Sequence, residues 1–264
     1  MSTLGLFFRA ECVKWRKSWV MLTMILAPVC QVGFLFMILW FSDDLVRRFK
    51  PGFQFWVELN YLTWNIVFLP IGIAIISDLS WDLELEAKTW NHLLLQPAPR
   101  RTHFLAKLLS HLTLILISQC LLALLLIPMG LLLQSHLGSI MGTWTQPDWF
   151  TNTIALHLFI KFAGYSILAS LPLVAFHTWL SARFTGLWVA LGVALIGIWF
   201  CSQYAGQNRL IQFLPWGMAS QMVVIFDRWK RHIPWELFPG SLFSGALLTL
   251  LGALDFSQDK EKRS

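Results

Sequence analysis

Six long apolar runs constrain this chain more than any other feature of its sequence. Each offers about 20 residues with few or no charges, the length that crosses a hydrocarbon core of ~30 Å as a helix. Helices are expected because backbone groups without a hydrogen-bond partner are costly in lipid. We therefore predict an all-α membrane protein with one domain over residues 1–264. The six predicted spans are 19–41, 60–79, 106–133, 153–181, 184–204 and 237–255.

The amino-acid composition agrees with a membrane protein. Of 264 residues, 56% are hydrophobic and 13% are charged, against roughly 25% charged residues in a soluble domain. These values exclude a secreted disulfide scaffold, a coiled coil, a disordered chain and a soluble nucleotide-binding enzyme. The four cysteines show no CxxC spacing, and we expect them to pack as small apolar residues without a disulfide or a metal.

The distribution of Lys and Arg predicts the orientation of the chain. With the N-terminus inside, the inner segments carry twelve of these residues and the outer segments carry seven. Cytoplasmic loops hold the excess of basic residues in membrane proteins, so both termini are predicted to be cytoplasmic. The net charge of +6 is attributed to basic loops facing an anionic lipid surface, rather than to nucleic acid.

Two segments outside the spans have distinct predictions. Residues 1–18 are expected to form an interfacial elbow helix on the inner leaflet. Four apolar residues share one helical face there: Leu4, Phe8, Cys12 and Trp15. Residues 206–236, interrupted by Pro215 and Gly217, are predicted to be an external re-entrant or interfacial segment.

Small residues recur at every fourth position of the fifth predicted span: Gly186, Ala190 and Ala194. Such a stripe lets two helices approach closely. The neighbouring helix can belong to this chain or to a second copy, and the sequence does not decide between them.

Motifs for nucleotide hydrolysis, metal binding and nucleophilic catalysis do not occur in the sequence. There is no G-x-x-x-x-G-K-[ST] P-loop, no HExxH and no G-x-S-x-G. We therefore predict no enzymatic activity and no metal site, and any ATP and Mg²⁺ are expected on a separate subunit.

Ionisable residues are sparse within the predicted spans. Lys161 is the one charge deep in a span, and His157 shares its helical face at i, i+4 spacing. His103 and His111 lie two turns apart, but neither pair has a third ligand for a metal. Lys161 can face a polar cavity or extend to the lipid headgroups, and both alternatives stay open. His157 and Lys161 are the candidate residues of a transport pathway.

The loop between the second and third spans carries the most informative pattern. Residues 82–95 are predicted to form a short amphipathic helix, with Ser80 or Asp82 as its N-cap. Pro97 and Pro99 end this helix. Its apolar stripe consists of Leu83, Ala87, Trp90 and Leu94. The stripe can lie on lipid or dock into a groove of a cytosolic partner, because both surfaces require the same pattern.

The same loop resembles the permeases of the ABC-2 type. That family has an acidic residue, a Thr-Trp pair, a Leu pair, a Pro, an Arg and a Lys that opens the next span. The matching residues here are Glu84, Thr89, Trp90, Leu93, Leu94, Pro97, Arg100 and Lys107. The resemblance is closest to the small permease subunits of lantibiotic and bacteriocin self-immunity transporters. The six-span layout and the aromatic-Pro-Trp stretch at 213–220 are also similar, whereas Lys88 stands where the family often has Gly or Asn.

This resemblance implies a half-transporter in the inner (plasma) membrane of a bacterium, with the fold of ABC-2, or type V, exporters. Two permease chains, identical or paired with a sister chain, would work with two ATPase subunits. Residues 82–95 would be the coupling helix, which Glu84 would orient by a charged hydrogen bond to a basic residue of the ATPase or of the elbow helix. The implied coupling residues are Glu84, Glu86, Thr89, Trp90, Leu93 and Leu94, with support from Asp78, Arg100 and Lys107.

The function that we expect is the expulsion of an amphipathic antimicrobial peptide from the membrane, and export of drugs, lipids or glycans stays open. Three rivals come from other classes: a carrier driven by an ion gradient, a membrane enzyme and a structural subunit. Sparse charge within the spans argues against the carrier, and the lack of nucleophile–base spacing argues against the enzyme.

Overall fold

The computed structural model describes residues 3–15, 18–42, 53–86, 99–141, 153–184, 186–205, 207–222 and 238–258. These residues form helices joined by short turns, and no strand occurs among them. The predicted all-α fold is therefore confirmed for the described part of the chain. The main helices are α1 (Thr3–Trp15), α2 (Trp19–Phe41), α4 (Phe53–Thr63), α5 (Leu69–Glu86), α7 (Arg100–Met141), α8 (Thr153–Arg183), α9 (Leu187–Gln203) and α12 (Phe238–Gln258).

Membrane-crossing length is reached by five helices in the described ranges. They are Trp19–Phe41, Phe55–Glu84, Arg100–Leu133, Phe159–Arg183 and Phe238–Phe256. The fifth predicted span, 184–204, corresponds to α9, which is apolar but has only 17 residues. Seventeen residues make about 26 Å of helix, slightly less than the hydrocarbon thickness. The chain is thus a multi-pass membrane protein.

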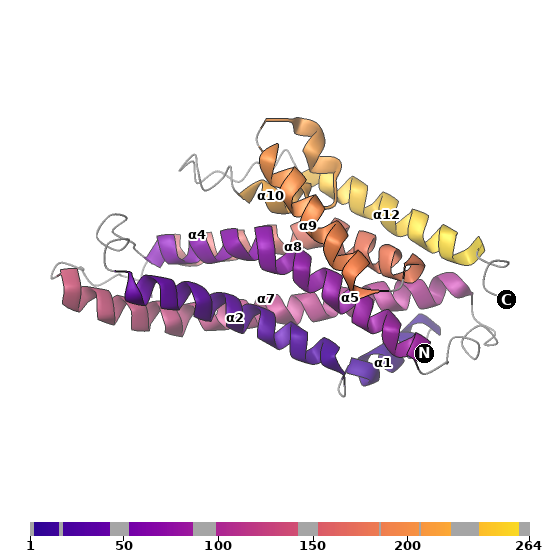
Figure 1. Cartoon of the computed structure of the whole chain (residues 1–264), viewed down its shortest axis with the longest axis horizontal. Helices are drawn as coiled ribbons and strands as arrows, with labels where there is room; N and C mark the ends of the chain where they lie inside the picture. Colours follow the sequence, from indigo (N-terminus) through magenta and orange to yellow (C-terminus); the bar gives the residue numbers. More distant parts are fainter. Residues whose placement is uncertain are drawn as a thin grey trace.

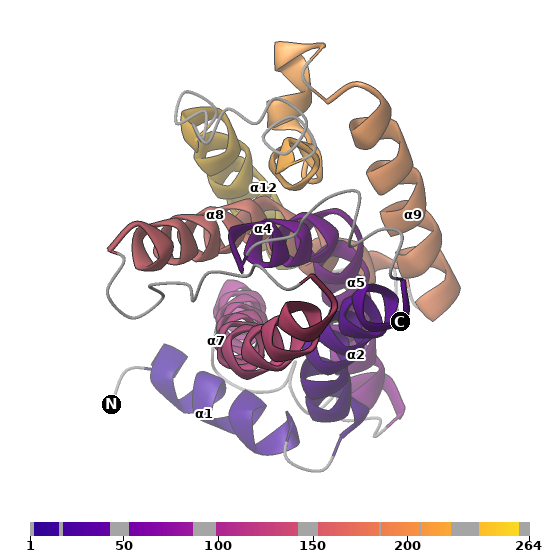
Figure 2. The same ribbon diagram turned by 90° about the vertical axis from the view of Figure 1, so that its left-hand side faces the viewer.

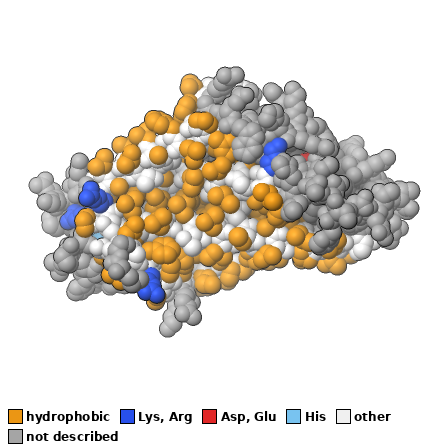
Figure 3. Space-filling view, turned by 180° about the vertical axis from the view of Figure 1, so that it is seen from behind, with side chains coloured by type: hydrophobic (Ala, Val, Ile, Leu, Met, Phe, Trp, Pro, Cys, Tyr) orange, Lys and Arg blue, Asp and Glu red, His pale blue; other side chains and the backbone are white. Residues whose placement is uncertain are grey.

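The long helices lie side by side along the long axis of the molecule, and α1 runs across them at one end (Figures 1 and 2). α7 contacts α1, α2, α8 and α12, so it links α1 and α2 to the rest of the bundle. Seen from behind, hydrophobic side chains cover most of the described surface and basic side chains form small patches (Figure 3). Such an apolar surface is that of a protein embedded in lipid.

The second span is one long helical segment that contains a π-helical turn, η1, at Trp64–Phe68. This turn joins α4 to α5, and α5 then continues without a break to Glu86. The prediction that a separate helix starts at Ser80 or Asp82 is therefore wrong. Residues 87–98, which contain most of the predicted coupling helix, lie outside the described residues.

The residues predicted to form the elbow are helical over Thr3–Trp15 as α1, and the predicted lipid-facing stripe packs on protein. α1 packs against α7, Trp15 is buried, and the other members of the stripe are half-buried. The stripe therefore contacts the bundle, and α1 also carries the exposed apolar residues Leu6 and Val13 on another side.

The small residues of α9 meet a neighbour within this chain. Ala190 and Ala194 form a cluster with Ala74 of α5, so the alternative of a second copy is not needed to explain the stripe. Gly186 precedes α9 with φ +131°, a conformation that L-residues with a side chain rarely adopt. Gly186 therefore allows the sharp turn between α8 and α9.

The described part of the predicted external segment folds back onto the helices. It contains η2 (Arg209–Phe213) and the single turn α10 (Gly217–Ser220). The four residues of α10 are all buried. α10 contacts α8, α9, α12 and η1. Tyr165 of α8 fixes it by donating from its hydroxyl to the Met218 carbonyl at 2.6 Å.

A proline inside α2 is compensated by a side chain of α7. Pro28 cannot donate to the carbonyl of Met24, four residues earlier, and the Ser118 hydroxyl donates to that carbonyl at 3.1 Å instead. We expect Ser118→Ala to lower the free energy of unfolding by about 1–2 kcal/mol, because a buried acceptor loses its donor. Denaturant unfolding in detergent measures this. Thr113→Ala is the control, since Thr113 is near the surface and bonds within its own helix; an equal loss in both variants would contradict the account.

Candidate functional site

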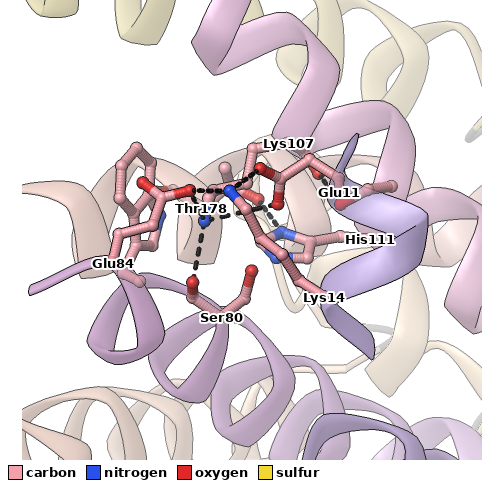
Figure 4. Close-up of polar contacts among 9 residues, drawn as sticks. Glu11, Lys14, Ser80, Glu84, Lys107, His111 and Thr178 are labelled. Atoms are coloured by element: carbon pink, nitrogen blue, oxygen red, sulfur yellow. Dashed lines mark hydrogen bonds and ion pairs between the residues drawn. The ribbon is translucent and has the colours of Figure 1, made fainter. Parts of the chain in front are cut away.

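Charged side chains gather where α5 ends and α7 begins, on both sides of the segment 87–98. Glu84 lies in the last turn of α5, and Lys107 lies two turns into α7. α1 contributes Glu11 and Lys14 to the same place (Figure 4). We call these four residues the ion cluster.

Lys107 is the central cation of the ion cluster. Its Nζ donates to Glu84 Oε1 at 2.8 Å and to the Ser80 carbonyl at 2.7 Å. The same Nζ lies 3.5 Å from Glu11 Oε2 and 4.5 Å from the centre of the Trp81 ring. Lys107 therefore contacts α1 and two successive turns of α5, and the Trp81 face adds a cation–π interaction.

Lys14 is the second cation and links α1 to α5. Its Nζ donates to Glu84 Oε1 at 2.7 Å and also pairs with Glu11, one turn earlier on α1. Burial by itself would lower the pKa of Lys14, but the carboxylates of Glu11 and Glu84 outweigh burial and raise it above its ordinary value. Lys14 therefore stays positively charged at neutral pH.

The ion cluster is largely withdrawn from solvent. Lys107 is 2% exposed and Glu84 is 4% exposed. Two positive and two negative groups balance one another, but their desolvation is expensive, so buried ion pairs add little net stability. Such a cluster specifies an arrangement instead, here the positions of α1, α5 and α7 relative to one another.

Neutral hydrogen bonds extend this junction to α8. The Trp81 indole N–H donates to the Thr178 carbonyl at 3.1 Å. His111 Nδ1 lies 2.8 Å from the Thr178 hydroxyl, and the His103 ring packs on Phe7 of α1 with 4.1 Å between centroids. The two histidines thus have separate packing partners, and no group of His, Cys, Asp and Glu that could hold a metal occurs among the described residues.

A second ionic contact lies between α8 and α12. Arg183 pairs with Asp255, and the Trp179 indole N–H donates to Asp255 Oδ2 at 2.9 Å. This contact ties the last turn of α8 to the last turns of α12.

The structure brings some of the predicted site residues together. Glu84 and Lys107 form the core of the ion cluster, whereas Arg100 is the first residue of α7. Asp78 is buried on α5, close to the Gly186 backbone at the turn between α8 and α9. Lys161 is half-buried on α8.

The side chains of the other predicted site residues are not among those that the structure describes. His157 belongs to α8 and Glu86 ends α5, but only their backbones are described. Four more lie outside the described residues: Thr89, Trp90, Leu93 and Leu94.

Sequence reasoning missed Glu11 as a site residue and did not name Lys14, although it expected Glu84 to bond to a basic residue of the ATPase or of the elbow helix. Glu11 lies one helical turn before Trp15 on the packed side of α1, so the i, i+4 spacing offered a signal. The view that ionisable groups are sparse in the bundle was also incomplete, since the ion cluster is buried at its end.

The sequence of the chain matches a known protein family. The model of the ABC-2 family transporter proteins matches residues 7–201, well over half of the chain. The chain belongs to this family. It is therefore the membrane permease component of an ABC transporter, and it works with an ABC ATPase. The match begins within α1 and includes the ion cluster and the segment 87–98, and a comparison with curated proteins finds no match.

Proposed function

We propose that the permease is the membrane half of an ATP-driven exporter that expels an amphipathic antimicrobial peptide, as in lantibiotic or bacteriocin self-immunity. One observation carries the mechanism: the ion cluster joins α1, α5 and α7 at both ends of the segment 87–98. A force on this segment would reach three helices at once.

The proposed coupling starts on the segment 82–95. Trp90 and Leu94 would anchor in a groove of the ATPase, as buried aromatic and aliphatic residues do in other interfaces. Glu84 would face inward, because it bonds to Lys14 and Lys107 rather than projecting from the bundle. Closure of the ATPase dimer would then move α5 and α7 together and switch the bundle between two states.

The substrate class is inferred from the interior polarity. The buried polar residues along the middle of the spans include the neutral amides Gln31, Asn60 and Gln119. Gln31 bonds to Asn60 and Gln119 bonds to Ser166, so these polar groups are neutral and paired within the bundle and need no proton cycle. Drugs, lipids and glycans share this chemistry and are the alternative substrates.

The assembly follows the half-transporter plan. Two permease chains, identical or paired with a sister chain, would combine with two ATPase subunits that bind ATP and Mg²⁺. The complex would lie in the inner membrane of a bacterium with both termini of the permease in the cytoplasm, so that the ion cluster lies at the cytoplasmic end.

An ion-gradient carrier is the second candidate because Asp78 is a carboxylate buried within the second span. Such a carboxylate is typical of ion or proton sites in transporters. Transport that continues without any ATPase and stops in Asp78→Asn would favour this candidate over the exporter.

Trp90→Ala tests the coupling role of the segment 82–95. We expect the affinity of the variant for the ATPase to fall at least tenfold. Truncating an anchor residue of an interface costs about 2 kcal/mol or more of binding free energy. Peptide-stimulated ATP hydrolysis in proteoliposomes should fall in parallel. Trp188→Ala is the matched control, because Trp188 is highly exposed on α9.

The substrate is tested in the same proteoliposomes with a panel of lantibiotics, drugs and lipids. The proposal expects an amphipathic peptide to raise the ATPase rate and to leave the membrane. Intact coupling in Trp90→Ala would contradict the coupling role of the segment 82–95. ATP hydrolysis that no peptide alters would contradict the peptide substrate.

A further inference from the structure

The second span contains an irregular turn in the middle of the bundle. α4 and α5 meet at η1, where the Leu69 N–H donates to the Trp64 carbonyl, five residues earlier instead of four. A π-turn of this kind contains one residue more than the matching length of α-helix, and single π-turns occur frequently at functional sites. The second span also changes direction between α4 and α5 (Figure 1). The long helix therefore departs from regular geometry at η1.

Pro70 gives a physical reason for this turn. It is buried two residues after η1, and it has no N–H to donate to the carbonyl of Ile66, four residues earlier. In a regular α-helix the proline ring would also collide with that carbonyl, and the wider π-turn relieves the collision. The hydrogen-bond ladder of the second span is therefore weakened between Trp64 and Pro70.

Three side chains at this turn have hydrogen-bonding atoms that the present arrangement leaves unused. They are the Tyr61 hydroxyl, the Trp64 indole N–H and Asn65 Oδ1, all buried and without a hydrogen-bond partner among the described residues. Asn65 uses its Nδ2, which donates to the Tyr61 carbonyl of the same helix at 2.8 Å. Buried polar atoms without a partner are costly, so a second arrangement of η1 that supplies partners would compete with this one.

The helical segments on the two sides of η1 are each fastened to other helices. On the α4 side, the Trp56 indole N–H donates to the Leu126 carbonyl of α7 at 3.0 Å, and Gln31 of α2 donates to Asn60 at 2.9 Å. On the α5 side, Glu84 belongs to the ion cluster, about 22 Å of helix beyond η1. A change of angle between α4 and α5 is therefore concentrated at η1, the irregular turn between two fastened segments.

η1 also contacts the part of the chain that folds back onto the bundle. The buried turn α10 contacts η1 as well as α8 and α9. We propose that η1 is a hinge of the second span, at which α5 swings relative to α4 and thereby moves α10. The claim that ATP drives this swing through the ion cluster rests on the proposed function, whereas the hinge itself does not.

The hinge is measured by hydrogen–deuterium exchange on the whole permease in nanodiscs, without an ATPase. The backbone N–H groups of residues 64–69 are compared with those of residues 73–78, in the regular part of the same helix. Both stretches lie within the second span. We expect exchange to be about tenfold faster in 64–69, the effect of about one backbone hydrogen bond less. Equal exchange rates in the two stretches would overturn the hinge.

A straight variant, which lacks the additional residue, tests the same hinge by mutation. Val67 has the most exposed side chain of η1, so deleting it together with Pro70→Ala lets a continuous α-helix form while α4 and α5 keep their facing. Exchange near the deletion should slow about tenfold, to the rate of 73–78. Deletion of Ile75 is the matched control, because it shortens a regular helix and turns Glu84 about 100° away from the ion cluster. The control should fail to fold, and two deletions that are tolerated equally would contradict the account of η1.

The movement of α10 is tested in the complex of the permease with its ATPase, trapped with ATP and vanadate. Exchange in 217–220 should rise about tenfold on trapping in the wild type, as α10 loosens, and should stay unchanged in the straight variant. No rise in a wild-type complex that hydrolyses ATP, or an equal rise in both chains, would overturn the hinge as the route to α10. A permease that binds no ATPase would instead contradict the proposed function, and the comparison of 64–69 with 73–78 would still decide whether η1 is a hinge.

Discussion

Lys107→Met is expected to lower the free energy of unfolding of the permease by about 3–5 kcal/mol, the range for removing one partner of a buried ion pair. The substitution leaves Glu84 and Glu11 buried with one remaining cation, Lys14, which contacts both of them. It also removes the donor to the Ser80 carbonyl and the cation above Trp81. Unfolding in mixed micelles with increasing SDS measures the loss.

The double variant Lys107→Met with Glu84→Gln distinguishes the stability lost through the uncompensated charge from the stability lost through changed side-chain packing. Removing both charges should recover part of the stability, because the uncompensated carboxylate is gone. Arg101→Met is the control for a basic residue at the same end and should change stability by less than about 0.5 kcal/mol. A Lys107→Met variant as stable as this control would show that the ion cluster does not hold the three helices.

Gly197→Ala is expected to displace residues 207–222, here called the outer segment, from α9. An added Cβ would lie 2.3 Å from Cδ2 and 2.4 Å from Cε2 of Trp216. The indole cannot move away freely, because it packs edge-on against Phe176 and His177 with ring centroids 5.1 and 5.7 Å apart. Overpacking of this kind costs about 1–3 kcal/mol. Limited proteolysis of the outer segment should be faster in the variant.

Gly192→Ala is the matched control on the same helix. Nothing lies within 4 Å of the Cβ that this change would add, and alanine favours a helix over glycine by up to about 1 kcal/mol. The control should therefore be neutral or stabilising. Equal proteolysis of the Gly197→Ala and Gly192→Ala variants would contradict the contact between Trp216 and α9.

The spans could be predicted from the sequence because the hydrophobic pattern records contact with lipid. The ends of the helices could not, since α5 and α7 extend beyond the apolar runs into residues that pack on protein. Ser80 and Asp82 resemble helix caps locally, but the helix continues through them because Ser80, Trp81 and Glu84 bond to α7 and α8. Tertiary contacts overrode a local signal there.

The ion cluster was only half predictable for a related reason. Glu84 and Lys107 belong to a recognisable family pattern, whereas Glu11 and Lys14 look like ordinary surface charges of an amphipathic helix. Their burial depends on which side of α1 faces α7. α1 has two apolar faces, and the spacing of apolar residues alone does not show which of them packs on the bundle.

The most direct test of coupling is purification of the tagged permease from its native membrane in mild detergent, with identification of the accompanying proteins. The account predicts a Walker-containing ATPase with the wild-type chain, and its loss in Trp90→Ala. Recovery of a second six-span chain would show a heterodimer. A monodisperse permease free of any ATPase would contradict the coupling account and leave the ion-gradient carrier as the better description.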